Sequence, residues 1–431
     1  MPQSLIARKL LVKNTILNLV GSGLPLLVAL FTIPLLIEGL GLDRFGALVL
    51  ASVFIGYFSL FDMGVGRALT KLAAEFLGNG RHDDIPGLVW TAFALMGLLG
   101  VIFGLLVIFL TPWLVTVLLS VPESLQDETI NAFQLLGAAI PIIMTTAGLR
   151  GLLEAYQRFA TINLIKVPVG IFTYLGPLIV LYIEDSLVAV IGVMVAVRVI
   201  AWVAYVVLCF TGIKDLKGRP ATFRKNMIRP ILAFGGWITI SNVVGPILLY
   251  SDRFLVGAML SLDAVSYYAT PYDIVTKLLI VPAAVIGVMF PAFSFLFAES
   301  REKTALLYKR CLGIVALVLI PFVFLIVVYA NEGLTFWIDA SFAAQSQRVV
   351  RWLAIGVFIN SLGLVSQALV QASGRPDITA KLHMLELPLF LAYLPLLVAE
   401  YGIDGAAFAW VIRVSISTLF LSYFAAQRVR Y

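Results

Sequence analysis

Long, uninterrupted apolar segments limit the fold of this sequence more than any other feature. A helix that spans the hydrocarbon core of a bilayer needs about 20 apolar residues, and twelve such segments can be placed along the 431 residues. Charged residues make up only 13% of the chain, whereas soluble domains carry about 25%. The segments do not alternate in polarity, as barrel strands would. We therefore predict an all-α integral membrane protein with twelve transmembrane helices.

The predicted helices form two groups of six on either side of a basic connector. The first six are 14–37, 45–65, 88–110, 129–149, 161–183 and 187–212. The last six are 231–260, 264–290, 312–329, 350–372, 382–398 and 406–425. This spacing predicts an N-terminal six-helix lobe over 1–212, a connector over 213–230 and a C-terminal six-helix lobe over 231–431.

The distribution of Lys and Arg predicts the orientation. Most of the 30 basic residues lie in the N-terminal tail, the connector, the C-terminal tail and alternate loops. The opposite loops hold Arg44, Arg348 and Arg351. Because basic loops stay on the cytoplasmic side, we expect both termini to be cytoplasmic. The net charge of +6 then reflects topology, and we expect no nucleic acid as a partner.

Short matches recur between the two halves at a nearly constant offset. The three pairs are Leu42-Asp43 with Leu262-Asp263, Leu152–Arg158 with Leu369–Arg375, and Val197–Val199 with Ile412–Val414. Chance matches among apolar helices are the alternative explanation. Their common order favours duplication, and both halves start on the same side. We therefore predict a parallel repeat, in which the substrate site lies between the halves near mid-membrane.

Charged residues inside predicted membrane helices are candidates for function, because burying a charge in lipid is costly. Asp252 and Arg253 lie about ten residues before the tip of the hairpin at Asp263, and Asp273 lies about ten residues after it. Ten helical residues span about 15 Å, half of a core of about 30 Å. Lys277 follows Asp273 by one turn, on the same helix face. Two interpretations stay open: structural pairs of Arg253 and Lys277 with Asp273, or cations that contact an anionic substrate while an acid exchanges its proton.

Other charged residues are weaker candidates. Arg198 and Arg413 occupy similar places in the sixth helix of each half, which predicts a shared role in structural pinning or anion contact. Asp62 lies near the cytoplasmic end of the second helix, where it can pair with Arg67 or face the cavity mouth. The remaining residues are interpreted without a functional role: Lys166 and Glu386 as snorkelling side chains, His82 as a loop residue, His383 as a helix start, and Asp83-Asp84 as a helix cap.

Motifs of catalysis and metal binding are missing from the sequence. It contains no P-loop, no G-x-S-x-G elbow, and no His/Cys cluster with metal-ligand spacing. We expect no enzymatic activity, no metal and no cofactor. A membrane glycan polymerase would be expected to carry a sizeable basic outward loop, and the loops at 122–128 and 331–347 do not provide one.

Several motifs resemble those of a known transporter family. In the first half they are Asn14, Asn18, Gly21, Pro25, the segment Gly39–Gly46, Tyr57, Asp62-x-Gly64-x-Gly66-x-Ala68 and Lys71. In the second half they are Ser251–Phe254, Tyr267-Tyr268, Pro282, Phe290-Pro291 and Gly374-Arg375. On these residues the chain resembles the polysaccharide transporters, the Wzx-type oligosaccharide flippases of the multidrug/oligosaccharidyl-lipid/polysaccharide exporter superfamily.

The resemblance implies transfer of a polyprenyl-diphosphate-linked oligosaccharide across the bacterial inner membrane by alternating access, for O-antigen, capsule or exopolysaccharide. Together with the placement of the charges, it leads to the hypothesis that Arg253, Lys277, Arg198 and Arg413 contact the substrate and that Asp252, Asp273 and Asp62 serve ion coupling. The implied partners are membrane lipids, a proton or sodium ion, and a polymerase with its chain-length regulator. A cation-coupled multidrug antiporter of the same superfamily is the main alternative, and a glycan polymerase is a disfavoured one.

Overall fold

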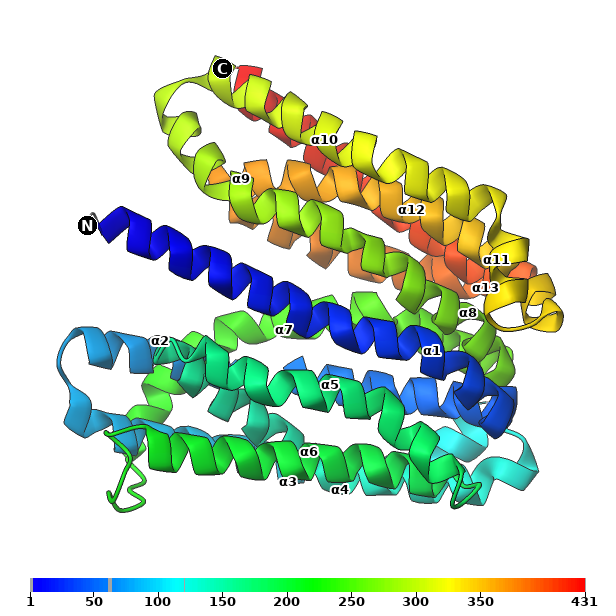
Figure 1. Cartoon of the computed structure of the whole chain (residues 1–431), viewed down its shortest axis with the longest axis horizontal. Coiled ribbons are helices and arrows are strands. Elements are labelled where there is room, and N and C mark those ends of the chain that lie inside the picture. The colour runs from blue at the N-terminus through cyan, green and yellow to red at the C-terminus, as the bar shows by residue number, and fades with distance from the viewer. Residues whose placement is uncertain (1–2, 61–63, 120, 431) are drawn as a thin grey trace. The chain divides into compact units, whose positions relative to one another are not determined.

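The computed structural model describes residues 3–60, 64–119 and 121–430, and every regular element in these residues is a helix (Figure 1). The chain divides into two compact units, Met1–Pro246 and Ile247–Tyr431, with the boundary inside α7 (Lys225–Met259). The helices that follow one another in the first unit are α1 (Gln3–Leu60), α2 (Val65–Gly78), α3 (Ile85–Trp113), α4 (Glu123–Ala155), α5 (Phe159–Leu181) and α6 (Leu187–Gly212). A 3-10 turn, η1 (His82–Asp84), precedes α3, and a π turn, η2 (Leu114–Leu118), follows it.

The second unit contains the end of α7 and the remaining helices. These are α8 (Leu262–Val275), the 3-10 turn η3 (Thr276–Leu279), α9 (Ile280–Glu299), α10 (Arg301–Val328), α11 (Ala330–Trp337), α12 (Ala340–Ala372) and α13 (Pro376–Arg430). Long helices run alongside one another within each unit (Figure 1). Each unit has its own buried apolar cluster, around Leu88 and Met96 in the first and around Val315 and Leu369 in the second.

Small residues bring α3 and α4 into close contact in the first unit. A Cβ atom added at Gly100 would lie 2.5 Å from Cα of Pro141, and one at Gly104 would lie 2.6 Å from the carbonyl oxygen of Gly137. Lipid tails are as apolar as Leu side chains, so helices in a membrane associate through such close packing rather than through the hydrophobic effect. The small-x-x-x-small spacing of Gly100 and Gly104 thus allows α3 to pack directly against α4.

Large apolar side chains are exposed along the outer helices. Phe109 on α3 is 76% exposed, and Leu317 and Phe324 on α10 are 76% and 63% exposed. An apolar surface of this extent is unusual for a protein in water. Nine stretches of the described residues are long and apolar enough to cross a membrane. The chain is therefore a multi-pass membrane protein.

Two pairs of predicted helices follow each other without a loop, and in each pair the two helices are separated by a kink at a glycine. Predicted helices 14–37 and 45–65 merge in α1, where Gly41 (φ 74°, ψ 165°) forms the kink. Predicted helices 382–398 and 406–425 merge in α13 across Gly402 (φ 58°, ψ −136°). Glycine adopts these positive φ angles without the steric cost that a Cβ would add. One of the nine spanning stretches is the whole of 376–429, which contains two predicted helices. The number of stretches is therefore not the number of spans. The total of twelve spans, the repeat and the domain limits remain predictions.

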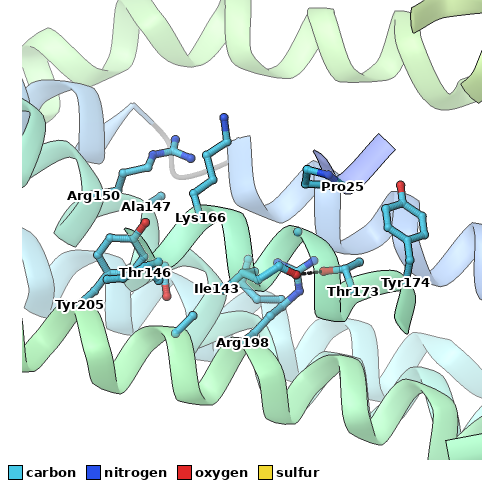
Figure 2. Close-up of a pocket in the computed structure, with 14 residues that line it drawn as sticks. Pro25, Ile143, Thr146, Ala147, Arg150, Lys166, Thr173, Tyr174, Arg198 and Tyr205 are labelled. Atoms are coloured by element: carbon cyan, nitrogen blue, oxygen red, sulfur yellow. Dashed lines mark hydrogen bonds between the residues drawn. The ribbon is translucent and has the colours of Figure 1, made fainter. Parts of the chain in front are cut away.

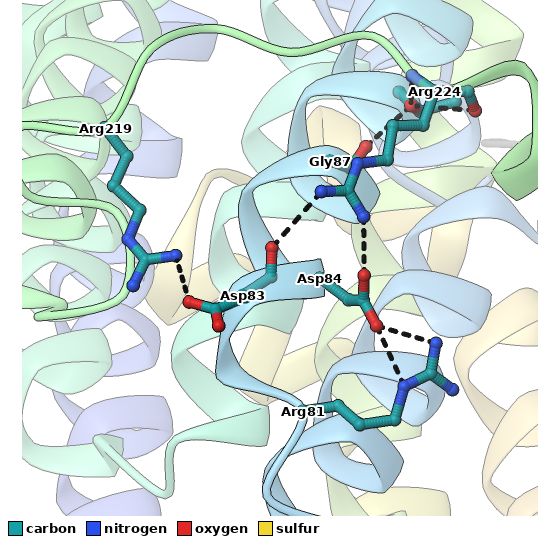
Figure 3. Close-up of polar contacts among 7 residues, drawn as sticks. Arg81, Asp83, Asp84, Gly87, Arg219 and Arg224 are labelled. Atoms are coloured by element: carbon teal, nitrogen blue, oxygen red, sulfur yellow. Dashed lines mark hydrogen bonds and ion pairs between the residues drawn. The ribbon is translucent and has the colours of Figure 1, made fainter.

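The connector is docked on the first unit through ion pairs and hydrogen bonds (Figure 3). Arg219 contacts Asp83 at 2.7 Å, and Arg224 contacts Asp84 at 2.5 Å. Asp84 stands at the N-cap position of α3, as predicted, but its carboxylate makes no capping hydrogen bond there. Both carboxylates are used instead to hold a basic segment that is more than 130 positions away in sequence.

A second set of contacts holds the first half of the connector. Asp215 accepts hydrogen bonds from Nδ1 of His82 at 3.2 Å and from the phenol of Tyr156 at 2.5 Å. Burial and the neighbouring Asp215 carboxylate raise the pKa of Tyr156, so the phenol stays protonated and remains a donor. His82 lies in the turn between α2 and α3, in line with the predicted loop position, and also contacts the connector.

Candidate functional site

A cavity of about 400 Å³ lies among α1, α4, α5 and α6 of the first unit (Figure 2). Its formation depends on the close approach of α1 and α5, because a Cβ atom at Gly170 would lie 2.5 Å from Cγ of Pro25. The side chains that bring polar atoms to its lining are Thr146, Arg150, Lys166, Thr173, Tyr174, Arg198 and Tyr205. Cavities that hold small ligands measure about 300–1,000 Å³, so this one is large enough for a headgroup-sized ligand.

Three cations line the cavity, and none of the described lining residues is acidic. Arg198 comes from the middle of α6, and its Nε has no hydrogen-bond partner in the described part of the chain. Arg150 of α4 lies 3.5 Å from Glu154 on the same helix, and Lys166 of α5 is exposed. Figure 2 shows the side chains of Arg150 and Lys166 extending toward the same side of the cavity. The cavity therefore carries positive charge that its lining does not neutralise.

The threonine hydroxyls of the cavity are already bonded to the helices that carry them, and the phenol of Tyr205 on α6 donates to the carbonyl of Ile162 on α5 at 3.5 Å. The hydroxyls of Thr146 and Thr173 donate to the carbonyls of Ile142 and Val169, at 2.6 and 2.7 Å. Such back-bonding keeps the hydroxyl hydrogen on the helix. The threonine oxygens can still accept a hydrogen bond, but the free donors come from the cations.

A buried charged cluster lies in the second unit, where α7 meets α8. Nη2 of Arg253 lies 2.6 Å from Asp273, and the Arg253 side chain is 6% exposed against 47% for Asp273. Asp252 is fully buried and accepts from the phenol of Tyr268 at 2.6 Å and from the backbone N–H of Arg253 at 2.8 Å. The guanidinium also lies 4.9 Å from the ring centre of Tyr272, within the range of a cation–π contact. The predicted pair of Arg253 with Asp273 is confirmed.

The predicted pair of Asp273 with Lys277 is wrong. The α-helical spacing ends at Val275, and Lys277 lies in the 3-10 turn η3. Lys277 is exposed, and within the described ranges no ion pair joins it to Asp273. A one-turn separation in sequence places two side chains on one face only while the helix keeps 3.6 residues per turn.

The other predicted site residues lie in different surroundings. Arg413 of α13 lies 5.3 Å from the ring centre of Phe390, and its Nε has no partner among the described residues. Arg198 faces the cavity instead, so the two arginines do not share one environment. Asp62 lies outside the described residues, and its predicted role stays a prediction.

Two lining cations and one buried acid were not singled out from the sequence. Arg150 follows directly after the predicted helix 129–149 and is therefore not among the charges inside predicted helices, and Lys166 is interpreted as a snorkelling side chain. Each of the two cations belongs to a row of lining residues on its helix. The cavity is lined by 143, 146, 147 and 150 on α4, and by 165, 166, 169, 170 and 173 on α5. This i, i+3, i+4 pattern marks one face of each helix and could have identified them. Glu386 is 6% exposed and lies 3.0 Å from His383, so the interpretation of Glu386 as snorkelling is wrong.

Comparison with known proteins places the chain among transporters. Residues 11–297 match the family model described as "Polysaccharide biosynthesis protein". The chain is 28% identical over 415 residues to a "Putative O-antigen transporter" of Shigella flexneri, covering 96% of this chain and 97% of that protein. It is 22% identical over 208 residues to a "Probable low-salt glycan biosynthesis flippase Agl15" of Haloferax volcanii, covering 47% of this chain and 44% of that one.

Solved structures share the fold. An inward-facing multidrug resistance MATE family transporter of the MOP superfamily superposes with a TM-score of 0.80 at 16% identity, covering 96% of this chain and 98% of that one. At this level of identity the likeness establishes the fold of a membrane transporter.

Proposed function

Because the chain belongs to the polysaccharide biosynthesis protein family, we propose that it is a flippase that moves a polyprenyl-diphosphate-linked oligosaccharide across the bacterial inner membrane. The observation that carries this proposal is the similarity to an O-antigen transporter along nearly the whole length of both chains. Such a match extends over nearly the whole chain and not over a single shared motif. The resemblance seen in the sequence motifs is confirmed by the family match.

The buried charges of the second unit favour this function over the export of organic cations. An antiporter for organic cations needs a carboxylate that is free to pair with its substrate. Asp273 is paired with Arg253, and Asp252 is bonded to Tyr268 and to the backbone. The cavity of the first unit is lined by cations. Both regions suit an anionic substrate better than a cationic one.

We propose the following roles for the predicted site residues. Arg198, Arg253, Lys277 and Arg413 contact anionic groups of the substrate, and Asp252, Asp273 and Asp62 serve ion coupling with a proton or a sodium ion. The two six-helix lobes alternate between inward-open and outward-open states. A polymerase and a chain-length regulator then act on the delivered glycan.

Contacts within the first unit support the predicted sidedness of its loops. Arg44, Glu128 and Asp185 come from three segments predicted to lie on the outer side, and Arg44 lies 2.9 Å from Glu128 and 3.0 Å from Asp185. The connector and the loop at Asp83, both predicted to be cytoplasmic, also contact each other. A membrane protein can form these contacts only between loops at the same surface.

The test is deletion of the gene, followed by extraction of polyprenyl-linked intermediates from the membrane. We expect a completed repeat unit to accumulate on the cytoplasmic leaflet and surface glycan to disappear, with both restored by the intact gene. Unchanged lipid intermediates together with increased sensitivity to cationic compounds would contradict the flippase proposal and would indicate an antiporter for organic cations.

A further inference from the structure

The outer side of the connector carries positive charge that no acid balances. Four of its six basic residues are exposed and make no ion pair within the part of the chain that the structure describes: Lys214, Lys217, Lys225 and Arg229. We propose that these four residues, here called the cationic face, bind the anionic headgroups of phospholipids in the adjacent leaflet. This inference goes beyond the proposed function, because it concerns a lipid of the membrane and not the transported substrate.

Buried apolar residues fix which side of the connector faces outward. Four residues of the connector and of the start of α7 belong to the buried cluster of the first unit: Ile213, Leu216, Met227 and Ile231. At the start of α7, Lys225 and Arg229 are four residues apart and therefore share one face of the helix. Met227 lies two residues from each of them and points to the opposite side, into the cluster. The cations are thus held away from the protein core.

The acids near the connector are already paired within the first unit. Asp83 lies 2.7 Å from Arg219, and Asp84 lies 2.5 Å from Arg224. Figure 3 shows both arginine side chains turned toward the start of α3. Asp215, the only acid of the connector in sequence, accepts hydrogen bonds from two side chains of the first unit. The first turn of α7 contains no acid, so the positive end of the helix dipole adds to the charge of the cationic face.

The place of the connector in the chain puts the cationic face at the level of the lipid headgroups. The spanning helix α6 ends at Gly212, and Ile213 is already buried against the first unit. α7 begins at Lys225, directly after the docked Arg224. A segment that is held at both ends against long apolar helices cannot extend far from the membrane surface. The nearest source of negative charge outside the protein is therefore the leaflet itself.

Exposed apolar side chains accompany these cations. Phe223 is 52% exposed and stands two residues before Lys225, and Leu232 is 45% exposed. Aromatic side chains are favoured at the interface between membrane and water. A surface that combines cations with exposed apolar groups binds an anionic membrane through both kinds of contact. A soluble acidic partner would satisfy the charge but would leave no reason for Phe223 to be exposed.

The test is titration of the purified full-length protein in an uncharged detergent with two lipids of the same chain length, phosphatidylglycerol and phosphatidylcholine. Bound lipid is counted by native mass spectrometry. Each Lys or Arg near an anionic surface strengthens binding by about fivefold. We therefore expect phosphatidylglycerol to bind at least about fivefold more tightly than phosphatidylcholine. Added salt should reduce this preference, because it screens exposed charges.

The decisive variant is Lys225→Gln/Arg229→Gln, which removes two exposed cations and keeps the docking contacts of the connector. We expect it to weaken phosphatidylglycerol binding by about ten- to thirtyfold and to leave phosphatidylcholine binding unchanged. The matched control is Lys309→Gln/Arg310→Gln, which also removes one exposed lysine and one exposed arginine, on α10. The control should bind both lipids like the wild type.

Two further variants separate charge from apolar contact and protect the test. Phe223→Ala should weaken the binding of both lipids alike, because an apolar contact does not depend on the charge of the headgroup. Lys214→Gln/Lys217→Gln removes the cations at the other end of the cationic face. It should lower the preference for phosphatidylglycerol in the same way, and it keeps the test valid if the first variant does not fold.

Three results would overturn the inference. One is equal affinity of Lys225→Gln/Arg229→Gln and its control for phosphatidylglycerol. Another is equal binding of the two lipids by the wild type. The third is tighter binding of a soluble oligoglutamate peptide than of phosphatidylglycerol, lost in Lys225→Gln/Arg229→Gln, which would assign the cationic face to an acidic protein segment. The proposed function would stand in each case, because it is tested by lipid-linked intermediates in cells.

Discussion

At the scale of single residues, Arg198 and Arg253 represent two ways to keep a guanidinium in apolar surroundings. Arg253 is nearly fully buried and is compensated by Asp273 and by aromatic rings. Arg198 lies against a cavity and has no acid beside it in the described residues. The first arrangement stabilises the contact of two helices, and the second leaves charge available to a ligand.

The Arg253–Asp273 pair leads to a prediction about stability. Asp273→Asn leaves a buried guanidinium without its counter-charge, which costs about 3–5 kcal/mol for a fully buried pair. Because Asp273 is 47% exposed, we expect a smaller loss of about 1–3 kcal/mol after discounting for solvent screening. The measurement is thermal unfolding of the purified protein, with Asp127→Asn, an exposed acid on α4, as the control.

The double variant Arg253→Gln/Asp273→Asn separates pairing from other effects. In the double variant both charges are gone, so no guanidinium is left buried without its counter-charge. We therefore expect the double variant to unfold at a higher temperature than Asp273→Asn alone. If Asp273→Asn melts like Asp127→Asn, the ion pair does not stabilise the hairpin.

At the scale of elements, the connector is a docked segment rather than a free tether. The backbone N–H of Arg224 donates to the hydroxyl of Thr91 at 2.9 Å, and its guanidinium bonds to Asp84. Gly87 makes room for this side chain, because a Cβ there would lie 2.5 Å from Cδ of Arg224. The start of α7 is thereby attached to the start of α3 (Figure 3).

We predict that Gly87→Ala loosens the connector. The added methyl group displaces the Arg224 side chain, which removes the contact with Asp84. Partly exposed ion pairs contribute about 0–1 kcal/mol, so overall stability should fall by no more than that. Hydrogen exchange of residues 213–224 should become several-fold faster. Gly78→Ala is the matched control, because a Cβ at Gly78 meets nothing within 4 Å. Equal exchange in the two variants would show that Gly87 does not hold the connector.

At the scale of the whole molecule, two compact units follow one another along one chain. Their helices are long, apolar and exposed on the outside. The basic residues that the sequence places on alternate loops then set the orientation in the membrane. Orientation and number of spans can be measured without any knowledge of the substrate.

We predict that the N-terminus, the connector and the C-terminus lie in the cytoplasm. Reporters fused at these three places should therefore give the cytoplasmic signal. The segments 122–128 and 331–347 should lie outside the cytoplasm, because they hold no Lys or Arg. Phosphatase and fluorescent-protein fusions provide complementary signals for the two sides. An outward signal from the connector, or an odd number of spans, would contradict the twelve-helix topology.

The amino-acid sequence alone determines what depends on neighbours along the chain. Runs of apolar residues make helices that can span a membrane, because every backbone hydrogen bond is then satisfied within the segment. Spacing around the hairpin tip at Asp263 was enough to place Arg253 and Asp273 at the same depth, since both helices start from a shared turn, and their pairing was one of the two interpretations left open. The transporter family was also identifiable from local motifs.

Tertiary structure alone decided which distant charges meet. Arg150, Lys166 and Arg198 lie on three helices and line one cavity only because those helices pack with particular faces inward. The carboxylates of Asp83 and Asp84 bind the connector rather than the first N–H groups of α3, and Glu386 is buried beside His383. The rotation of a helix about its axis and its partners are set by packing across the bilayer interior. A charge inside a helix therefore identifies a candidate, but its partner depends on the packed fold.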